Sequence, residues 1–573
     1  MERRLLLAIV LTFVVLTAYQ WLVPTVQPVT PGSTAATGAS PAAKPAATPA
    51  PAPAPASAAG APAPAPAPPV VAVRADTAER TVTVDNGVVR AVFSNRGATL
   101  AAWELLRYAG PDGRPVDLVP HDVPADQPKP FSLRLDDSVK TSRLNTALFT
   151  VAGGTAPADA AANLDARTAP VTVTFEYEDA AGLRARKQFT VKPQSYEVTF
   201  SATVNDGERA LNPFVQWGPG LGDVLATGAR SMFGGVATRM SEAILSVGGK
   251  VERIQAAALA TTPRHQGSYE FAGVDTHYFI STVVKPGTAE LVYSPLSVPS
   301  KTATAPVSRA YVGYDIRFQS TPANARFYVG PKHFDTLKQT DPDLVRAIWF
   351  GMFAFLSVPL LSALNWVHGF IGNYGWSIIA LTVIINAAMF PLRHKSNVSM
   401  RKMQAIQPQV KAIQDRYKHL KATDPARQKM NTEMMELYRQ KGVNPASGCV
   451  PMLLTFPVLL AFYSLLSESI ELRNAPFIWW IHDLAAPDPF YVTPILMGAS
   501  QVLQQKMMPM TGADPVQQRM MLFMPIIFTF LFITSPAGLA LYWFASNVLV
   551  IGQQLLTNRL IAAPVGKRVE TKK

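Results

Sequence analysis

The stretch YGWSIIALTVIINAAMFPL, residues 374–392, contains no Asp, Glu, Lys or Arg. Further charge-free stretches follow it, at about 448–467, 489–505, 520–535 and 537–556. A helix needs about 20 apolar residues to cross a bilayer, within a range of about 17–25. The stretches are long enough to cross a membrane, or nearly so. They therefore predict a five-helix membrane core over residues 373–556.

The first 23 residues predict a transmembrane anchor whose start lies in the cytoplasm. Arg3 and Arg4 precede an apolar run from Leu5 to Val23. A cleaved signal peptide is the alternative, but the run is long for one, and small residues at A-x-A spacing do not closely follow it. Residues 24–72 are rich in Pro and Ala, a composition typical of an extended linker.

Residues 73–335 predict a periplasmic β-sandwich. Short runs of alternating polar and apolar residues recur, and Asp85-Asn86-Gly87 predicts a hairpin turn between two of them. The single cysteine, Cys449, excludes an intrachain disulfide. The expected fold class is thus an α-helical membrane protein, with an N-terminal anchor and a five-helix core, that carries a large periplasmic all-β sandwich domain.

Residues 341–372 predict an amphipathic helix that lies at the outer membrane face. Asp341-Pro342-Asp343 is a helix-start signal. Aromatic and polar residues, with Pro359, interrupt the apolar stretch that follows. A sixth membrane span is the alternative, but it would place the basic loop after residue 392 outside the cell.

Residues 393–447 predict a cytoplasmic hairpin of two helices. The loop carries 12 Lys and Arg residues against four acids. Apolar residues recur at spacings of three and four, from Met403 to Leu420 and again from Met430 to Leu437, which favours two helices sealed along one seam. Pro408 is expected to kink the first helix. The charges either set topology alone or also contact partners, for which the candidates are Lys411, Arg416, Lys418 and Lys421.

The net charge of +13 does not by itself indicate a nucleic-acid-binding protein, because Lys and Arg gather beside the predicted spans. This placement predicts a multi-pass membrane protein with both termini in the cytoplasm. The basic tail, residues 557–573, either touches anionic lipid or contacts ribosomal RNA.

Uncharged polar residues lie within the predicted spans. Thr382 and Asn386 share one helix face, as do Tyr542 and Ser546, with Asn547 beside them and Thr455 in another span. Unpaired polar groups are costly in hydrocarbon, so these side chains must face one another, water or a polar guest. Hydrogen bonding between helices is the alternative to a polar substrate groove.

Enzyme and transporter classes find little support. The chain has no H-E-x-x-H and no P-loop, and no Ser–His pair lies at one membrane depth. The spans hold no carboxylate or cation of the kind that a coupled transporter uses. We therefore expect neither catalytic residues nor a cofactor, a metal or a small-molecule substrate.

Several ordered motifs resemble those of the YidC membrane protein insertases, most strongly over residues 341–560. They are GWSII (375–379), MFPL (389–392), VNP (443–445), GCVP (448–451), ELRNAPF (471–477), WIHDL (480–484), PILMG (494–498), MPIIF (524–528), GLALY (538–542) and SN (546–547). The resemblance implies a hydrophilic groove, open to the cytoplasm and the lipid, through which nascent membrane proteins are inserted and folded without nucleotide hydrolysis. It implies work in the bacterial inner membrane, alone or beside the Sec translocon, with the hairpin receiving the substrate.

At one position the residue differs from the pattern of the family that the chain resembles, since many members of that family carry an Arg in the first core span. Asn386 stands there in this chain. The sequence therefore predicts a groove that works by hydration and hydrogen bonding alone, with no cation. A membrane-anchored scaffold whose periplasmic β-domain binds a ligand is the alternative function.

Overall fold

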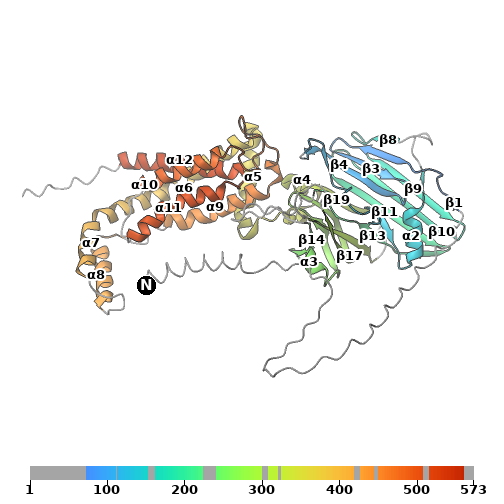
Figure 1. Cartoon of the computed structure of the whole chain (residues 1–573), viewed down its shortest axis with the longest axis horizontal. Coiled ribbons are helices and arrows are strands. Elements are labelled where there is room, and N and C mark those ends of the chain that lie inside the picture. The colour runs from blue at the N-terminus through green and yellow to red at the C-terminus, as the bar shows by residue number, and fades with distance from the viewer. Residues whose placement is uncertain are drawn as a thin grey trace, which may run out of the picture. The chain divides into compact units, whose positions relative to one another are not determined.

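The computed structural model describes residues 72–110, 112–152, 162–223, 241–299, 308–319, 324–417, 426–443, 450–507 and 515–560. These residues form a β-domain followed by a helical core (Figure 1). The predicted anchor, nearly all of the linker, and the basic tail beyond residue 560 lie outside the described residues.

The β-domain consists of two sheets. Within the described residues the larger sheet has 14 strands: β1 Ala72–Arg74, β6 Ser132–Arg134, β7 Thr150–Ala152, β9 Val171–Asp179, β10 Leu183–Val191, β11 Glu197–Asp206, β12 Arg209–Leu211, β13 Phe214–Trp217, β14 Glu242–Val247, β15 Lys250–Gln255, β16 Arg264–Asp275, β17 Phe279–Pro299, β18 Ser308–Phe318 and β19 Ala325–Pro331. Its main path runs β1-β9-β10-β11-β19-β17-β16-β14-β15.

The smaller sheet has the order β5-β4-β3-β2-β8, with strands β2 Thr81–Asp85, β3 Val89–Ser94, β4 Thr99–Ala109, β5 Pro115–Asp117 and β8 Ala162–Asp165. The predicted hairpin turn joins antiparallel strands β2 and β3, and Gly87 has a φ of +87°, which glycine adopts without strain. Short helices α2 Ser138–Thr146, α3 Ala256–Leu259 and α4 Phe334–Thr340 complete the domain.

The two sheets enclose an aromatic core. The ring centroids of Phe93 on β3 and Phe189 on β10 lie 4.6 Å apart. The indole nitrogen of Trp103 on β4 donates to the carbonyl oxygen of Val329 on β19 at 2.8 Å. These contacts join the small sheet to the large one and confirm the predicted β-sandwich.

One side chain breaks the alternation of β10. Its inward positions are otherwise apolar, yet Lys187 also points inward and is 1% exposed. Its ammonium donates to the carbonyl oxygens of Gly97, Ala98 and Phe131, at 2.6, 3.3 and 2.8 Å. All three acceptor residues have positive φ angles, of 64°, 47° and 66°. Lys187 thus bonds two turns held in left-handed conformations, which are strained for Ala and Phe.

The helical part contains η1 Pro342–Ala347, η2 Gly351–Phe353, α5 Ala354–Ile371, α6 Tyr374–Ala405, α7 Gln407–Arg416, α8 Ala426–Gln440, α9 Val450–Glu468, η4 Ile470–Leu472, α10 Val492–Met507, α11 Pro515–Phe532 and α12 Ala537–Leu560. Each of the five predicted spans thus coincides with a helix: α6, α9, α10, α11 or α12.

Among the described residues, three helical stretches are long and apolar enough to cross a membrane, judged by length and composition alone: Gly351–Ile371, Tyr374–Ala405 and Ala537–Thr557. Shorter apolar stretches occupy Phe456–Glu468 and Phe523–Phe532. The predicted core helices α6 and α12 are thus long enough as they stand.

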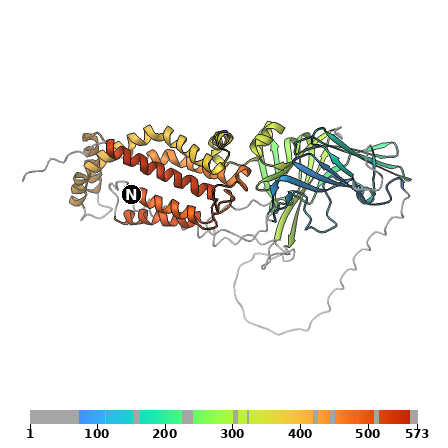
Figure 2. The ribbon, with the colours of Figure 1, turned by 90° about the horizontal axis from the view of Figure 1, so that it is seen from above.

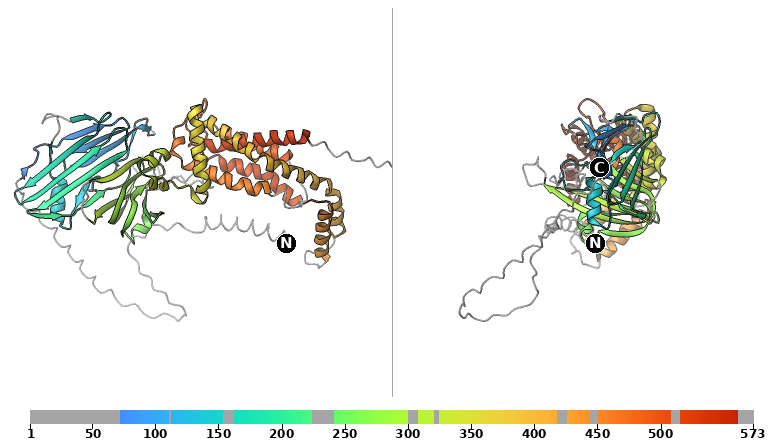
Figure 3. Two further views of the ribbon diagram at one scale, coloured as in Figure 1. Left: turned by 180° about the vertical axis from the view of Figure 1, so that it is seen from behind. Right: turned by 90° about the vertical axis from the view of Figure 1, so that its right-hand side faces the viewer.

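Helix α5 packs on α6 and α9, and it runs across the axes of the other core helices (Figures 1 and 3). In Figure 2 the view is almost along the axis of α5. Asp341 caps η1, where the sequence predicted a helix start, and Gly372 ends α5 with a φ of +73°. The outward side chains include Phe355, Trp366 and Phe370, which are 74%, 64% and 75% exposed. Such a face suits a lipid environment better than water.

The predicted hairpin consists of α7 and α8, which lie at the opposite end of the bundle from α5 (Figure 1). Its first arm begins later than predicted, because α6 continues without a break to Ala405. Pro408 lies in the first turn of α7, where its missing N–H breaks no helix hydrogen bond. The seam buries Ile406, Val410 and Val443.

Candidate functional site

Helix α6 presents a polar face inside the apolar core. The Thr382 hydroxyl donates to the Ile378 carbonyl at 2.6 Å, and the Asn386 amide nitrogen donates to the Thr382 carbonyl at 2.8 Å. Thr382 is fully buried and Asn386 is 7% exposed. The four-residue spacing therefore places both side chains on one face, as the sequence predicted.

Arg393 extends this face, which differs from the expectation of a face without a cation. A guanidinium nitrogen of Arg393 donates to the side-chain oxygen of Asn386 at 2.5 Å, and the residue is 9% exposed. Helical side chains lean toward the N-terminus of their helix, so a long side chain at position 393 reaches back toward position 386. That lean was the sequence signal for a residue that the prediction had assigned to the loop. Thr382, Asn386 and Arg393 are here called the polar face of α6.

Helices α9 and α12 meet this face. The ring of Tyr542 on α12 stacks on Phe462 of α9, with centroids 4.1 Å apart and planes 7° apart. Tyr542 is 4% exposed and lies close enough to Arg393 for electrostatic interaction. Farther along α12, the Gln553 amide donates to the Phe390 carbonyl at 3.4 Å. Tyr542 therefore lies near the Arg393 end of the polar face.

The remaining candidate groove residues differ in their surroundings. The Asn547 amide donates to the Ser500 hydroxyl at 3.0 Å and to the Met497 carbonyl at 3.3 Å. Asn547 on α12 therefore makes hydrogen bonds to α10, which was the alternative to a groove position. Ser546 is half-buried beside it. The backbone of Thr455 lies in α9, but its side chain is outside the described part of the structure.

The hairpin candidates lie far along the chain from this face. Lys411 is exposed, and Arg416 is 3.7 Å from Glu433, which also accepts a 2.6 Å hydrogen bond from the Tyr417 hydroxyl. Lys418 and Lys421 are outside the described residues. The described charges thus lie on the surface of a hairpin whose apolar seam does not need them.

Polar contacts link the β-domain to the last turn of α9 and to the segment that follows it. A buried carboxylate oxygen of Glu471 accepts the backbone N–H of Phe334 at 3.1 Å, and burial raises the pKa of this carboxyl. The imidazole of His277 lies 2.9 Å from the Ser467 carbonyl oxygen. The β-domain is therefore not held by the linker alone.

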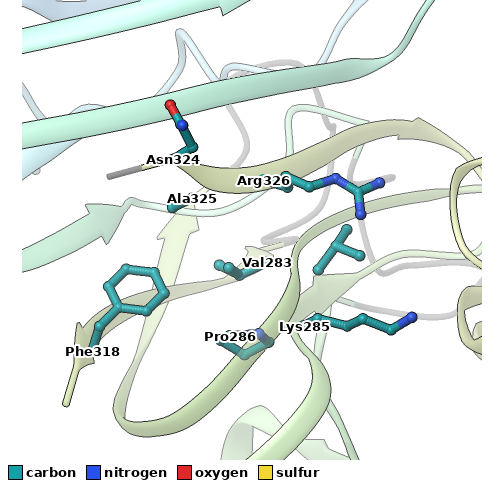
Figure 4. A pocket seen from close by; sticks show the side chains of 8 residues that line it. Val283, Lys285, Pro286, Phe318, Asn324, Ala325 and Arg326 are labelled. Atoms are coloured by element: carbon teal, nitrogen blue, oxygen red, sulfur yellow. The ribbon is translucent and has the colours of Figure 1, made fainter. Parts of the chain in front are cut away.

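A pocket of about 150 Å³ opens in the β-domain, lined by Val283, Val284, Lys285, Pro286, Phe318, Asn324, Ala325 and Arg326 (Figure 4). Its two cations already have partners: Lys285 is 2.6 Å from Asp341, and Arg326 is 2.6 Å from Glu197. In Figure 4 their charged ends point away from Phe318. The pocket offers little free charge to an anionic ligand.

A core of membrane-compatible helices with a buried polar face, joined to a large β-domain, defines an integral membrane protein with a substantial extramembrane domain. Family models match both parts: "60Kd inner membrane protein" at residues 366–564 and "YidC periplasmic domain" at residues 81–363.

A "Membrane protein insertase YidC" of Geobacter metallireducens is 35% identical over 99% of this chain and 100% of its own length. A protein of the same name from Geobacter sulfurreducens is 35% identical over 84% of this chain and 87% of its own. The chain belongs to the YidC family of membrane protein insertases. It is an inner-membrane protein, and its β-domain is the periplasmic domain of that family.

A solved structure described as "Active YidC insertase crystal structure with the first transmembrane domain resolved" matches with a TM-score of 0.33 and 18% identity. The match covers 86% of this chain and 94% of that one. The family assignment rests on the sequence relatives.

Proposed function

We propose that this insertase passes client segments along the polar face of α6 together with Tyr542. The observation that carries the proposal is the row of bonded polar side chains on α6, in a helix apolar enough to cross a membrane. Polar groups at that depth lower the cost of moving a client's own polar residues through hydrocarbon. The site needs no nucleotide, because partition of the client's apolar residues into lipid drives insertion.

Photocrosslinking tests this route. A photoreactive amino acid at position 386 should capture a stalled nascent membrane protein, and one at position 384 should capture mainly lipid. Ile384 is the matched control because it lies on the same helix and is 50% exposed. Equal capture at both positions would contradict a route along the polar face.

The same proposal covers folding assistance to clients and action either alone or beside the Sec translocon. The hairpin's charges would receive clients, or a ribosome, at the cytoplasmic end. Anionic phosphate and acidic client segments are the chemistry that a cationic hairpin attracts.

The expected topology places both termini and the hairpin in the cytoplasm and α5 at the periplasmic face. Cysteines introduced at positions 60, 300, 420 and 570 of a Cys449→Ser protein report it. An impermeant thiol reagent added to cells with a permeable outer membrane should label positions 60 and 300 only. Labelling of position 420 would place the hairpin in the periplasm and refute the arrangement.

Replacing Lys411, Arg416, Lys418 and Lys421 with Gln should slow client engagement several-fold at low salt and leave the fold intact. The buried seam residues Ile406, Val410 and Val443 are not altered. Because salt screens charges, the difference from wild type should shrink as salt rises. Insertion rates equal to wild type at every salt concentration would mean that these charges only set topology.

The scaffold alternative and the insertase proposal predict different insertion activities for a truncated chain. If the periplasmic domain were the working part, residues 341–560 alone would support no insertion of a short single-span client. The insertase proposal expects the core to retain activity, reduced by the loss of contacts such as Phe334 to Glu471.

A further inference from the structure

The segment that joins η4 to α10 carries exposed aromatic side chains on a strained backbone. Trp479 is 84% exposed with a φ of +43°, and Tyr491 is 48% exposed with a φ of +57°. Phe490, beside Tyr491, is 66% exposed. Bulky residues seldom adopt a left-handed conformation, and they keep it only where the surrounding structure holds it. Trp479, Phe490 and Tyr491 are here called the aromatic rim.

Two hydrogen bonds close the turn that carries Trp479. The N–H of Phe477 donates to the Ile481 carbonyl, and the N–H of Ile481 donates to the Ile478 carbonyl, each at 2.9 Å. The ring of Phe477 packs edge-on to Trp376 in the first turn of α6, with centroids 5.4 Å apart. The turn is therefore fixed to the bundle, at the end of α6 that lies opposite the hairpin.

Asp488 fixes the second turn and keeps its own charge away from the surface. Its carboxylate accepts the backbone N–H groups of Phe490 and Thr493 at 3.0 and 2.8 Å, and the indole N–H of Trp480 at 3.1 Å. Its backbone carbonyl accepts the N–H of Tyr491 at 3.1 Å. The Asp488 side chain is buried, so this turn presents aromatic rings outward and its carboxylate inward.

The aromatic rim continues the outward face of α10. Tyr491 directly precedes the helix, and its carbonyl accepts the N–H of Ile495 at 3.2 Å, as in a helical turn. Ile495 and Leu496 are exposed, and exposed apolar residues on a membrane helix face lipid. Trp and Tyr gather where such a face reaches the lipid headgroups, because each ring is apolar and carries one polar group. A phospholipid surface is therefore the partner that fits the rim.

We propose that the aromatic rim is a lipid-binding site that enters the boundary between headgroups and acyl chains of the periplasmic leaflet and fixes the depth of α10 there. The two hydrogen-bonded turns hold the rings in place before lipid binds, so little ordering of the segment opposes binding. The site depends on the proposed periplasmic placement of this end of the bundle, but not on the proposed client route.

Quenching of a bimane label tests the site in the full-length protein, in nanodiscs of phosphatidylethanolamine and phosphatidylglycerol. A Cys449→Ser protein receives one labelled cysteine at position 479, 490 or 474. Lipid with a nitroxide near its headgroup should quench positions 479 and 490 about threefold more than position 474, and aqueous iodide should show the reverse order. Asn474 is the matched control: it is exposed in the same segment with a φ of +57°, but its amide donates to the Ala109 carbonyl of β4 at 3.4 Å.

Ring variants separate lipid binding from a role in folding. In the protein labelled at position 490, Trp479→Gly should lower quenching by the nitroxide lipid about twofold, because it removes a ring from the rim. It should leave the melting temperature in detergent unchanged or raised, because glycine adopts a positive φ without strain. Trp479→Phe keeps a ring and should retain the quenching. Asn474→Gly relieves a similar backbone conformation where the segment meets the β-domain, and it should leave the quenching unchanged.

Three results would overturn the lipid-binding site. Equal quenching by iodide at positions 479, 490 and 474 would place the rim in water. A photoreactive amino acid at position 479 that captured a protein instead of lipid in native membranes would make the rim a protein-docking surface. A Trp479→Gly protein with a lower melting temperature would show that the ring packs the turn. No client is present in these measurements, so failure of the client route would leave them unchanged.

Discussion

Replacing Lys187 with Met should destabilise the periplasmic domain by about 1–3 kcal/mol, because a buried donor is removed while its acceptors remain. Met has a similar length but donates nothing, so the carbonyls of Gly97, Ala98 and Phe131 lose the ammonium that joins them. The left-handed turns that carry them lose their common anchor. Hydrogen exchange of the β-domain amides in the full-length protein measures the change.

The pH dependence of this variant provides a second measurement. Burial lowers the pKa of Lys187 to about 7, below that of a lysine in the unfolded chain. Stability rises with pH wherever the unfolded state binds more protons. The wild-type domain should therefore gain stability as the pH rises from about 7 toward the ordinary lysine pKa of about 10.4, and the Met variant should lack this gain.

Lys250→Met is the control, since Lys250 is exposed on β15 and its loss should change stability by less than about 0.5 kcal/mol. If Lys187→Met had no larger effect than Lys250→Met, the three carbonyl contacts would not contribute to the stability of the domain.

Gly498→Ala should destabilise the packing of α10 on α11 by about 1–3 kcal/mol, as overpacking does elsewhere, and Gly498→Leu should cost more. A Cβ at this position would lie 1.9 Å from the hydroxyl oxygen of Thr529 and 3.1 Å from its Cβ. The helices must therefore separate or Thr529 must move. Small residues permit such close approach where helices pack in a membrane. The melting temperature of the protein in detergent should fall, and its accumulation should fall with it.

Two variants complete this test. Gly552→Ala on α12 is the matched control, because a Cβ there has no atom within 4 Å and alanine favours helix. It should be neutral or slightly stabilising. Thr529→Ala should partly rescue Gly498→Ala, since it removes the nearest atom. If Gly498→Ala and Gly552→Ala had the same melting temperature, α10 and α11 would not be so closely packed.

Local patterns in the sequence predicted most of the architecture. Charge-free stretches predicted the positions of all five core helices, because the cost of placing a residue in hydrocarbon depends on its own type. The Asn86-Gly87 turn located a hairpin, because glycine tolerates a positive φ. The motifs from residue 375 onward also indicated the family.

Contacts between distant residues could not be predicted in this way. The alternation of β10 marked position 187 as inward, but only the folded sandwich brings the turns at residues 97–98 and 131 to Lys187. Asn547 looked equivalent to Asn386 in the sequence. In the structure Asn547 hydrogen-bonds to Ser500 on α10, whereas Asn386 accepts a hydrogen bond from Arg393. Helix packing decides which polar group lies within reach of each amide.

Composition, the positions of the core helices, the β-sandwich and the family were thus determined by the sequence itself, since each depends on residue type and short spacing. The cation on the polar face was decided only in the tertiary structure. Arg393 reads as one charge of the basic loop until α6 continues past it and buries it against Asn386. Whether a charge at a membrane edge turns outward to water or inward to a buried acceptor depends on the partners that the packed helices supply.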